Sequence, residues 1–216
     1  MQSDVNITRI PPFKEWKKRK LLVIHMETPH LDVEDCLKLA SIPFDVLEFD
    51  DEKLVSKIKR QLDDCIGIII TGSINYGQEL PAVPDTIMTA KVPKLGICYG
   101  CEELGQFLGA NIIDCNPPIG EKSDVAAKLE KCVLFDGMDT NDQTMVTMAH
   151  TNMLDKVPDG CRVIASTDLT PVAGFECPDM GIFGLQFHPE KGWLGDIIFK
   201  NFFIFFCCSY IITIFK

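Results

Sequence analysis

Cys98 stands between two glycines in the segment GICYG, which begins at Gly96 and ends at Gly100. A short apolar run precedes this segment and a helical pattern follows it, so a tight turn from strand to helix is expected. Such a turn holds a nucleophile in a strained, exposed position, and glycines let neighbouring backbone approach. The first amides of the helix would favour the thiolate, and the amide of Tyr99 would face an oxyanion. The alternative is a cysteine that only fills the end of a strand.

A cysteine nucleophile also needs a general base. The chain has four histidines, and one of them, His188, lies in the segment QFHPE. Pro189 restricts the backbone directly after it, and Glu190 could accept the second N–H of the imidazole and stabilise its charged form. The alternative is a surface histidine beside a solvated glutamate. A cysteine turn on the same chain favours the catalytic interpretation.

The acidic balance of the chain limits its partners. The 216 residues suffice for one well-packed domain or at most two small ones. They carry 21 basic and 31 acidic side chains, a net charge of −10. Nucleic acid is therefore not expected as a partner, because phosphate binding needs concentrated positive charge. The one basic run, at 13–20, is interpreted as a solvated arm.

Ten cysteines require an explanation. They lack the short spacings of a disulfide framework, and no apolar secretory segment precedes them. The only CxxC pair, Cys98 and Cys101, has no second pair beside it, so no zinc site is expected. Cys101 could form a regulatory disulfide with Cys98, but packing beside Leu104 and Leu108 is the favoured interpretation. These features indicate a reducing, cytoplasmic compartment with mostly buried free thiols.

The pattern of apolar residues predicts an α/β fold with a doubly wound, mostly parallel central sheet and flanking helices. Strands and helices alternate in the first half, which is typical of parallel pairing. The second half has short strands between tight turns, so a mixed or antiparallel extension of the sheet is expected. The expected strands are 20–26, 44–50, 65–71, 92–97, 131–135, 144–150, 161–166, 171–177 and 181–190, and the expected helices are 33–41, 52–62, one near 84–91 and 193–206.

The chain is expected to divide into an N-terminal arm at 1–19, one domain at 20–206 and an apolar tail at 207–216. The end of the chain is strongly apolar from 202 onward. A membrane span needs roughly 20 apolar residues, and this run is shorter. A segment buried in the protein or covered by a partner is the favoured interpretation, and a tail anchor or an aberrant gene end are the alternatives.

GICYG and QFHPE together resemble the paired motifs of the class I, or triad, glutamine amidotransferase family. The resemblance covers residues 20–206 and implies a flavodoxin-like α/β fold. Several segments are most similar to the amidotransferase domain of guanosine monophosphate synthetases. These are LGICYGCEELGQFLGA at 95–110, the stretch MVTMAH to VAGFE at 145–176, and the end segments FGLQFHPE and GDIIFKNF.

The resemblance implies an activity and a role for each matching residue. A cysteine attacks the carboxamide of glutamine, a γ-glutamyl thioester forms, ammonia leaves and water then releases glutamate. By motif, Cys98 would be the nucleophile, His188 the base and then the acid, and Glu190 the residue that orients it. Backbone donors to the oxyanion would be Tyr99 with Ser73 or Gly72, and the residues near the substrate would be Glu102, His150, Thr151 and Asn152.

Four departures from the family pattern bear on glutamine specificity more than on cysteine hydrolase chemistry. Ser73 follows Gly72 where the family usually has a second glycine. Glu102 replaces a glutamine, and an ionised carboxylate cannot donate a hydrogen bond. His-Gly-Asp is replaced by HTN at 150–152, and the Asp-Phe-Gly-Ser-Gln type segment by HMETPHLD at 25–32.

Three functions remain open at this point. The first is a glutaminase, without any cofactor, that supplies ammonia to a separate ATP-dependent synthetase, since no ATP-pyrophosphatase domain follows in the chain as given. The second is a stand-alone γ-glutamyl cysteine hydrolase or peptidase. The third is a non-catalytic regulatory module. No metal site is expected, because His25 and His30 have only Glu27 or Asp32 nearby and no clearly placed third or fourth ligand.

Overall fold

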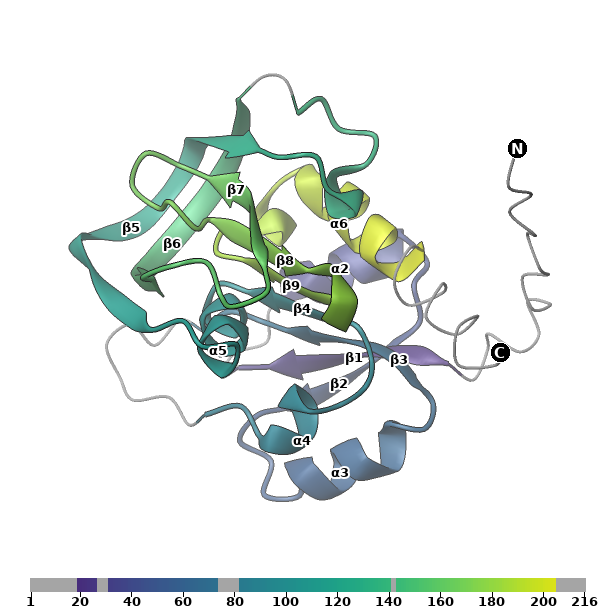
Figure 1. The fold of residues 1–216 in the computed structure, drawn as a ribbon. Coiled ribbons are helices and arrows are strands. Elements are labelled where there is room, and N and C mark those ends of the chain that lie inside the picture. Colours follow the sequence, from purple (N-terminus) through teal and green to yellow (C-terminus); the bar gives the residue numbers. More distant parts are fainter. Residues whose placement is uncertain (1–18, 27–30, 74–81, 141–142, 205–216) are drawn as a thin grey trace, which may run out of the picture.

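One mixed sheet organises the protein (Figure 1). The computed structural model describes residues 19–26, 31–73, 82–140 and 143–204. Within them the sheet has nine strands in the order β2-β1-β3-β4-β9-β8-β7-β5-β6. The strands are β1 (Lys20–His25), β2 (Phe44–Glu48), β3 (Cys65–Ile70), β4 (Lys94–Ile97), β5 (Ile112–Leu129), β6 (Thr144–Leu154), β7 (Arg162–Ser166), β8 (Gly174–Cys177) and β9 (Ile182–Leu185).

Helices cover both faces of the parallel part of the sheet. Buried residues of β1 alternate between two hydrophobic clusters: Leu21 and Val23 belong to one, Leu22 and Ile24 to the other. This period of two is that of a strand with both faces buried. The helices are α2 (Leu31–Leu39) and α6 (Leu194–Asn201) over the first cluster, and α3 (Leu54–Gln61), α4 (Asp85–Met88) and α5 (Tyr99–Phe107) over the second.

The strand order places three loops at one edge of the sheet. β4 pairs in parallel with β3 on one side and with β9 on the other. The carboxyl ends of these three neighbours therefore open onto the same region, where sites form in such sheets. Beyond β9 the sheet continues in antiparallel pairs through β8, β7, β5 and β6.

The predicted fold class and most of the predicted elements are confirmed. The doubly wound parallel part and the antiparallel extension are both present. The helices and strands expected in the first half all occur, with ends shifted by a few residues. The helix expected at 193–206 is α6, whose assigned span ends at Asn201. The expected arm at 1–19, except for Arg19, and the expected tail at 207–216 lie outside the described residues.

Two predicted strands are wrong wholly or in part. Residues 131–135 contain a short 3-10 helix, Val133–Phe135, which buries Leu134 and Phe135 in the core. A run this short and apolar carries no periodicity that separates a strand from a helical turn. The strand expected at 181–190 ends at Leu185, and a 3-10 turn, Pro189–Lys191, follows.

The sequence analysis missed the longest strand. β5 runs from Ile112 to Leu129 and pairs with β6 with three shifts of register. It contains Pro117 and Pro118, and proline argues against an interior strand because it lacks the N–H of the ladder. The irregular pairing shows how the strand accommodates them.

Most described cysteines are free thiols, as expected. Six are unpaired, and five of these are buried. Cys101 is among them and packs in the same cluster as Leu104, so it forms no disulfide with Cys98. The exception is a disulfide between Cys161 and Cys177, which the sequence spacing did not indicate.

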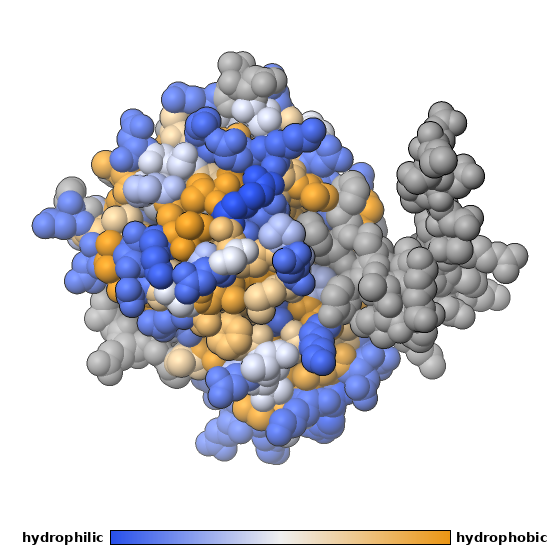
Figure 2. Space-filling view, viewed as in Figure 1, coloured by the Kyte–Doolittle hydropathy of each residue, from blue (hydrophilic) through white to orange (hydrophobic). Residues whose placement is uncertain are grey.

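Within the described residues, no helix is both long and apolar enough to cross a membrane. Polar side chains cover much of the face seen in Figure 2, with apolar ones gathered near its middle.

The contact between β3 and the start of α5 gives a stability prediction. A Cβ on Gly100 would lie 2.3 Å from the carbonyl oxygen of Ile70, so Gly100→Ala must push the helix off the sheet. We expect it to lower the free energy of unfolding by about 3 kcal/mol in chemical denaturation. Gly192→Ala is the matched control, because nothing lies within 4 Å of its Cβ position. Equal stability of the two variants would contradict the close packing of Gly100 against β3.

Candidate active site

Cys98 sits at the predicted turn, in a backbone conformation that is uncommon for a residue with a side chain. Its φ is 51° and its ψ is −108°, between the end of β4 and the start of α5. Such a conformation costs about 1–3 kcal/mol and persists only where the surroundings enforce it. Gly96 and Gly100 belong to those surroundings, because a Cβ on Gly96 would lie 2.3 Å from the Gly100 carbonyl oxygen.

The loop after β3 brings Gly72 against both Cys98 and His188. A Cβ on Gly72 would lie 3.1 Å from Cε1 of His188 and 3.2 Å from Cβ of Cys98. These three residues follow β3, β4 and β9, the three adjacent parallel strands. Residues far apart in the chain therefore meet at the carboxyl edge of the sheet.

His188 and Glu190 form a buried hydrogen-bonded pair. Nδ1 of His188 lies 2.7 Å from Oε1 of Glu190, and both side chains are at most 5% exposed. The main-chain N–H of His188 donates to the carbonyl of Thr147 on β6, at 2.9 Å, which holds the loop after β9. Since Nδ1 is occupied by the carboxylate, Nε2 is the nitrogen left for proton transfer.

The charged form of His188 is strongly favoured. Burial by itself lowers the pKa of the imidazole, but its interactions with the Cys98 sulfur and with Glu190 outweigh burial and raise it well above its ordinary value. Nε2 is buried and has no hydrogen-bond partner of standard geometry among the described residues. A charged imidazole beside the sulfur suits nucleophilic chemistry at Cys98.

The sulfur of Cys98 has two further neighbours. It lies 3.5 Å from the carbonyl oxygen of Ala149 on β6, and Nε2 of Gln186 lies 4.0 Å from it. The thiol is 4% exposed in this structure. The sequence analysis missed both neighbours. Gln186 lies in the same QFHPE segment as His188, which is the signal that could have pointed to it.

Glu102 lies on the first turn of α5, beside Gln186. Nε2 of Gln186 donates to Oε1 of Glu102 at 2.8 Å, and both side chains are buried. Burial raises the pKa of Glu102 to about 7; the hydrogen bond from Gln186 opposes the shift and the charge of Glu103 adds to it. A carboxyl group that titrates near neutral pH is therefore one amide away from the cysteine.

The residues predicted near the substrate at 150–152 lie on β6. His150 is buried, and its Nδ1 lies 2.7 Å from the carbonyl oxygen of Asn152. Burial lowers the pKa of His150, which keeps the ring neutral. Thr151 donates to the side chain of Asn152, which in turn contacts Asp114 of β5 at 3.4 Å. Within the described residues these side-chain contacts run along the β5–β6 hairpin and not to Cys98.

The three residues predicted to supply oxyanion donors border the cysteine. Tyr99 is the first residue of α5, so its amide lies at the amino end of the helix, directly after Cys98. Gly72 and Ser73 lie in the loop after β3, and the contacts of Gly72 place that loop against Cys98. Ser73 and Tyr99 are both half-buried.

His25, considered above as a metal ligand, lies at the end of β1 between two carboxylates. Its ring nitrogens are 3.7 Å from Glu34 and 3.3 Å from Glu48. Within the described residues no group of three or more His, Cys, Asp or Glu side chains could hold a metal ion. His30 and Glu27 lie outside those residues.

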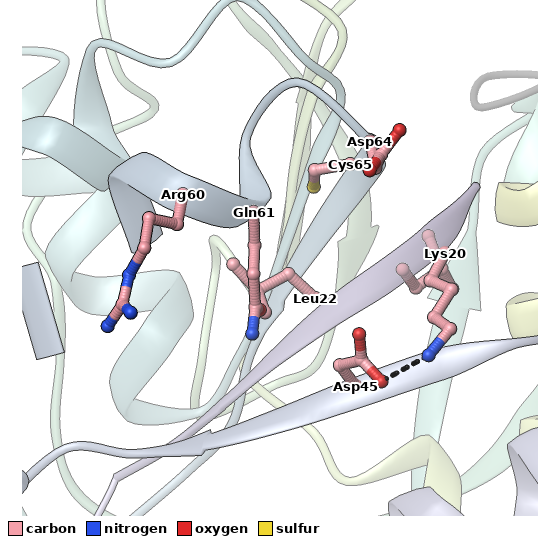
Figure 3. A pocket seen from close by; sticks show the side chains of 8 residues that line it. Lys20, Leu22, Asp45, Arg60, Gln61, Asp64 and Cys65 are labelled. Carbon is pink, nitrogen blue, oxygen red and sulfur yellow. Dashed lines mark hydrogen bonds and ion pairs between the residues drawn. The ribbon is translucent and has the colours of Figure 1, made fainter. Parts of the chain in front are cut away.

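A separate cavity of about 180 Å³ opens at the opposite edge of the sheet (Figure 3). Lys20 and Cys65, at the amino ends of β1 and β3, are among the residues that line it, and Lys20 is paired with Asp45 at 2.6 Å. It shares no residue with the cysteine site.

Comparison with known proteins decides the family. The model of the family Glutamine amidotransferase class-I matches residues 32–204. This chain belongs to that family.

Several relatives of this chain are GMP synthases (glutamine-hydrolyzing). The enzyme from Clostridium botulinum is 38% identical over 128 residues, which are 57% of this chain and 24% of that protein. The enzyme from Clostridium acetobutylicum is 34% identical over 157 residues, 71% of this chain and 30% of that protein. The chain thus spans less than a third of the length of these relatives.

Solved structures share the fold at lower identity. A GMP synthase-type protein from Thermoplasma acidophilum has a TM-score of 0.77 at 22% identity, and the match covers 92% of this chain and 98% of that protein. A glutamine amidotransferase from Thermotoga maritima has a TM-score of 0.65 at 21% identity, covering 92% of this chain and 86% of its own. The fold expected from the two motifs is confirmed.

The His188–Glu190 pair gives a prediction about protonation. Glu190→Gln removes one of the charges that raise the pKa of His188, so that pKa should fall. NMR titration of the imidazole carbons measures the shift. Glu34→Gln is the control, because Glu34 lies beside His25 and should leave His188 unchanged. An unaltered titration of His188 in Glu190→Gln would contradict the assigned interaction.

Proposed function

We propose that the protein is a glutaminase of the class I amidotransferase type, with Cys98 as nucleophile. The observation that carries the proposal is the meeting of Cys98, the buried His188–Glu190 pair and the Gly72 loop at one sheet edge. A nucleophile, a base, a residue that orients the base and backbone donors form a complete set for acyl transfer.

In the proposed reaction, the Cys98 proton resides on His188 and the thiolate attacks the carboxamide carbon of glutamine. The amides of Tyr99 and of Gly72 or Ser73 would stabilise the oxyanion. His188 returns its proton to the nitrogen as the C–N bond breaks, and ammonia leaves. Water, deprotonated by His188, then attacks the thioester, and the C–S bond breaks to release glutamate and the thiol. Glu190 would hold the ring in orientation throughout.

The proposed fate of the ammonia is transfer to an ATP-dependent synthetase. Support comes from the GMP synthases, which match this chain over only part of their own length. GMP formation is therefore the proposed use. The cytoplasm is the proposed compartment, because a reactive thiol needs reducing surroundings and most described cysteines are unpaired.

A second candidate is a γ-glutamyl cysteine hydrolase that acts without a partner. Glu102 is the observation that favours it. An ionised carboxylate near the cysteine repels the α-carboxylate that glutamine and γ-glutamyl peptides share. A γ-glutamyl peptide presents additional groups beyond the scissile amide, and contacts to these can offset the repulsion. The two candidates share the same nucleophile and differ in the substrate that they hydrolyse fastest.

The test is release of ammonia from L-glutamine by the purified protein, with γ-glutamyl peptides as competing substrates. Cys98→Ala should lower turnover on the order of a thousandfold or more, because it removes the nucleophile. Cys65→Ala is the matched control, since Cys65 lies at the other edge of the sheet and should retain full activity.

Labelling with the glutamine analogue 6-diazo-5-oxonorleucine tests whether Cys98 reacts even if the protein alone does not turn over glutamine. Labelling at Cys98 without turnover would indicate a site that requires its synthetase. Neither turnover nor labelling would overturn the enzymatic proposal and favour a regulatory module.

A further inference from the structure

We propose that Glu102 and Gln186 are positioning residues for Cys98, and that the site is reactive while Glu102 carries a proton and loses reactivity when Glu102 ionises. This inference rests on the proposed function. It concerns two side chains outside the Cys98, His188 and Glu190 set.

The geometry links the two residues to the sulfur. Gln186 is 0% exposed, and its Nε2 lies 2.8 Å from Oε1 of Glu102 and 4.0 Å from Sγ of Cys98. One amide group therefore separates the carboxyl group from the nucleophile. The sulfur and the carboxyl group cannot both be anionic there without mutual repulsion, because both are buried and poorly screened by solvent.

Gln186 has an unpaired atom that bears on the proton. Its Oε1 is buried and has no hydrogen-bond partner among the described residues. An ionised Glu102 can only accept a hydrogen bond, so it binds the amide nitrogen and leaves this oxygen unsatisfied. A protonated Glu102 still offers an oxygen that accepts from Nε2, although a neutral carboxyl group accepts more weakly than a carboxylate, so the hydrogen bond lowers the pKa of Glu102. Proton uptake thus removes a buried charge and keeps Glu102 and Gln186 in contact.

Other ionisable groups around Glu102 point in the same direction. Glu103 follows it on α5, is also buried, and accepts a hydrogen bond from the main chain of Val83 at 3.0 Å. Cys101 on the same helix and Cys115 on β5 both feel the charge of Glu102. None of these groups is a cation.

Among the described residues, His188 is the base that interacts with Cys98, and its neighbour His150 is kept neutral by burial. An ionised Glu102 would add a negative charge one amide away from the sulfur, and the pKa of Glu102, about 7, places this change near neutral pH.

The experiment measures how fast iodoacetamide alkylates Cys98 between pH 5.5 and 9, with the modified residue located by peptide mass spectrometry. Glu102→Gln keeps a hydrogen-bonding side chain that does not titrate. The ratio of its alkylation rate to that of the unaltered protein should rise by about threefold to tenfold as the pH passes 7. The kcat/KM for ammonia release, measured at the same pH values, should show the same rise.

The rise of this rate ratio with pH is a step whose midpoint reports the pKa of Glu102. Two variants should shift that midpoint in opposite directions. The hydrogen bond from Gln186 lowers the pKa of Glu102, so Gln186→Met should move the step to higher pH. Glu103 raises it, so Glu103→Gln should move the step to lower pH while leaving the Glu102–Gln186 bond in place. General damage to the site would not shift the two midpoints apart.

A ratio that stays constant with pH, or a step that neither variant moves, would overturn the inference. Alkylation needs no turnover, so the outcomes remain separate. A pH step without ammonia release would contradict the glutaminase and keep the positioning pair. Ammonia release without a pH step would support the glutaminase and contradict the positioning role of Glu102 and Gln186.

Discussion

The strained backbone of Cys98 is the constraint on which the site depends. A φ of 51° is costly for a residue with a Cβ, and a chain adopts it only where packing leaves no alternative. Here α5 lies so close to β3 that a side chain at Gly100 would overlap the Ile70 carbonyl. Helix α5 therefore begins directly after β4 and Cys98, with the sulfur at its amino end.

The order of the parallel strands supplies the remaining parts. β4 lies between β3 and β9, so the cysteine turn is flanked by the Gly72 loop on one side and the His188 loop on the other. The antiparallel extension adds the Thr147 and Ala149 carbonyls from β6, which hold the backbone of His188 and approach the sulfur. Three loops and one strand converge because the sheet fixes their ends.

Buried carboxyl groups near Cys98 explain why His188 favours its charged form. Glu102 and Glu190 are each at most 7% exposed, and each is hydrogen-bonded to a residue that lies beside Cys98. The interactions of His188 with Cys98 and Glu190 outweigh its burial and raise its pKa. His150, equally buried, faces a carbonyl and a hydroxyl and stays neutral.

Regular elements with strong patterns could be predicted, and irregular ones could not. The parallel strands and their helices followed from periodicity, because burial on both faces leaves a clear signature. The long strand β5 was missed because its prolines and shifted register follow no alternation. The turn at Val133–Phe135 looked like a strand because three apolar residues have no period. The Cys161–Cys177 bond joins two strands whose pairing no spacing revealed.

The sequence by itself determined the glycine-flanked turn at Cys98, the proximity of Glu190 to His188 and the class of fold, since each rests on residues close together in the chain. The tertiary structure alone decided which residues surround the sulfur. Gln186 reaches both Glu102 and Cys98, and Ala149 faces the thiol, only because the strands pair in one particular order. The burial that raises the pKa of Glu102 likewise arises from packing between distant segments, and local sequence carries no record of it.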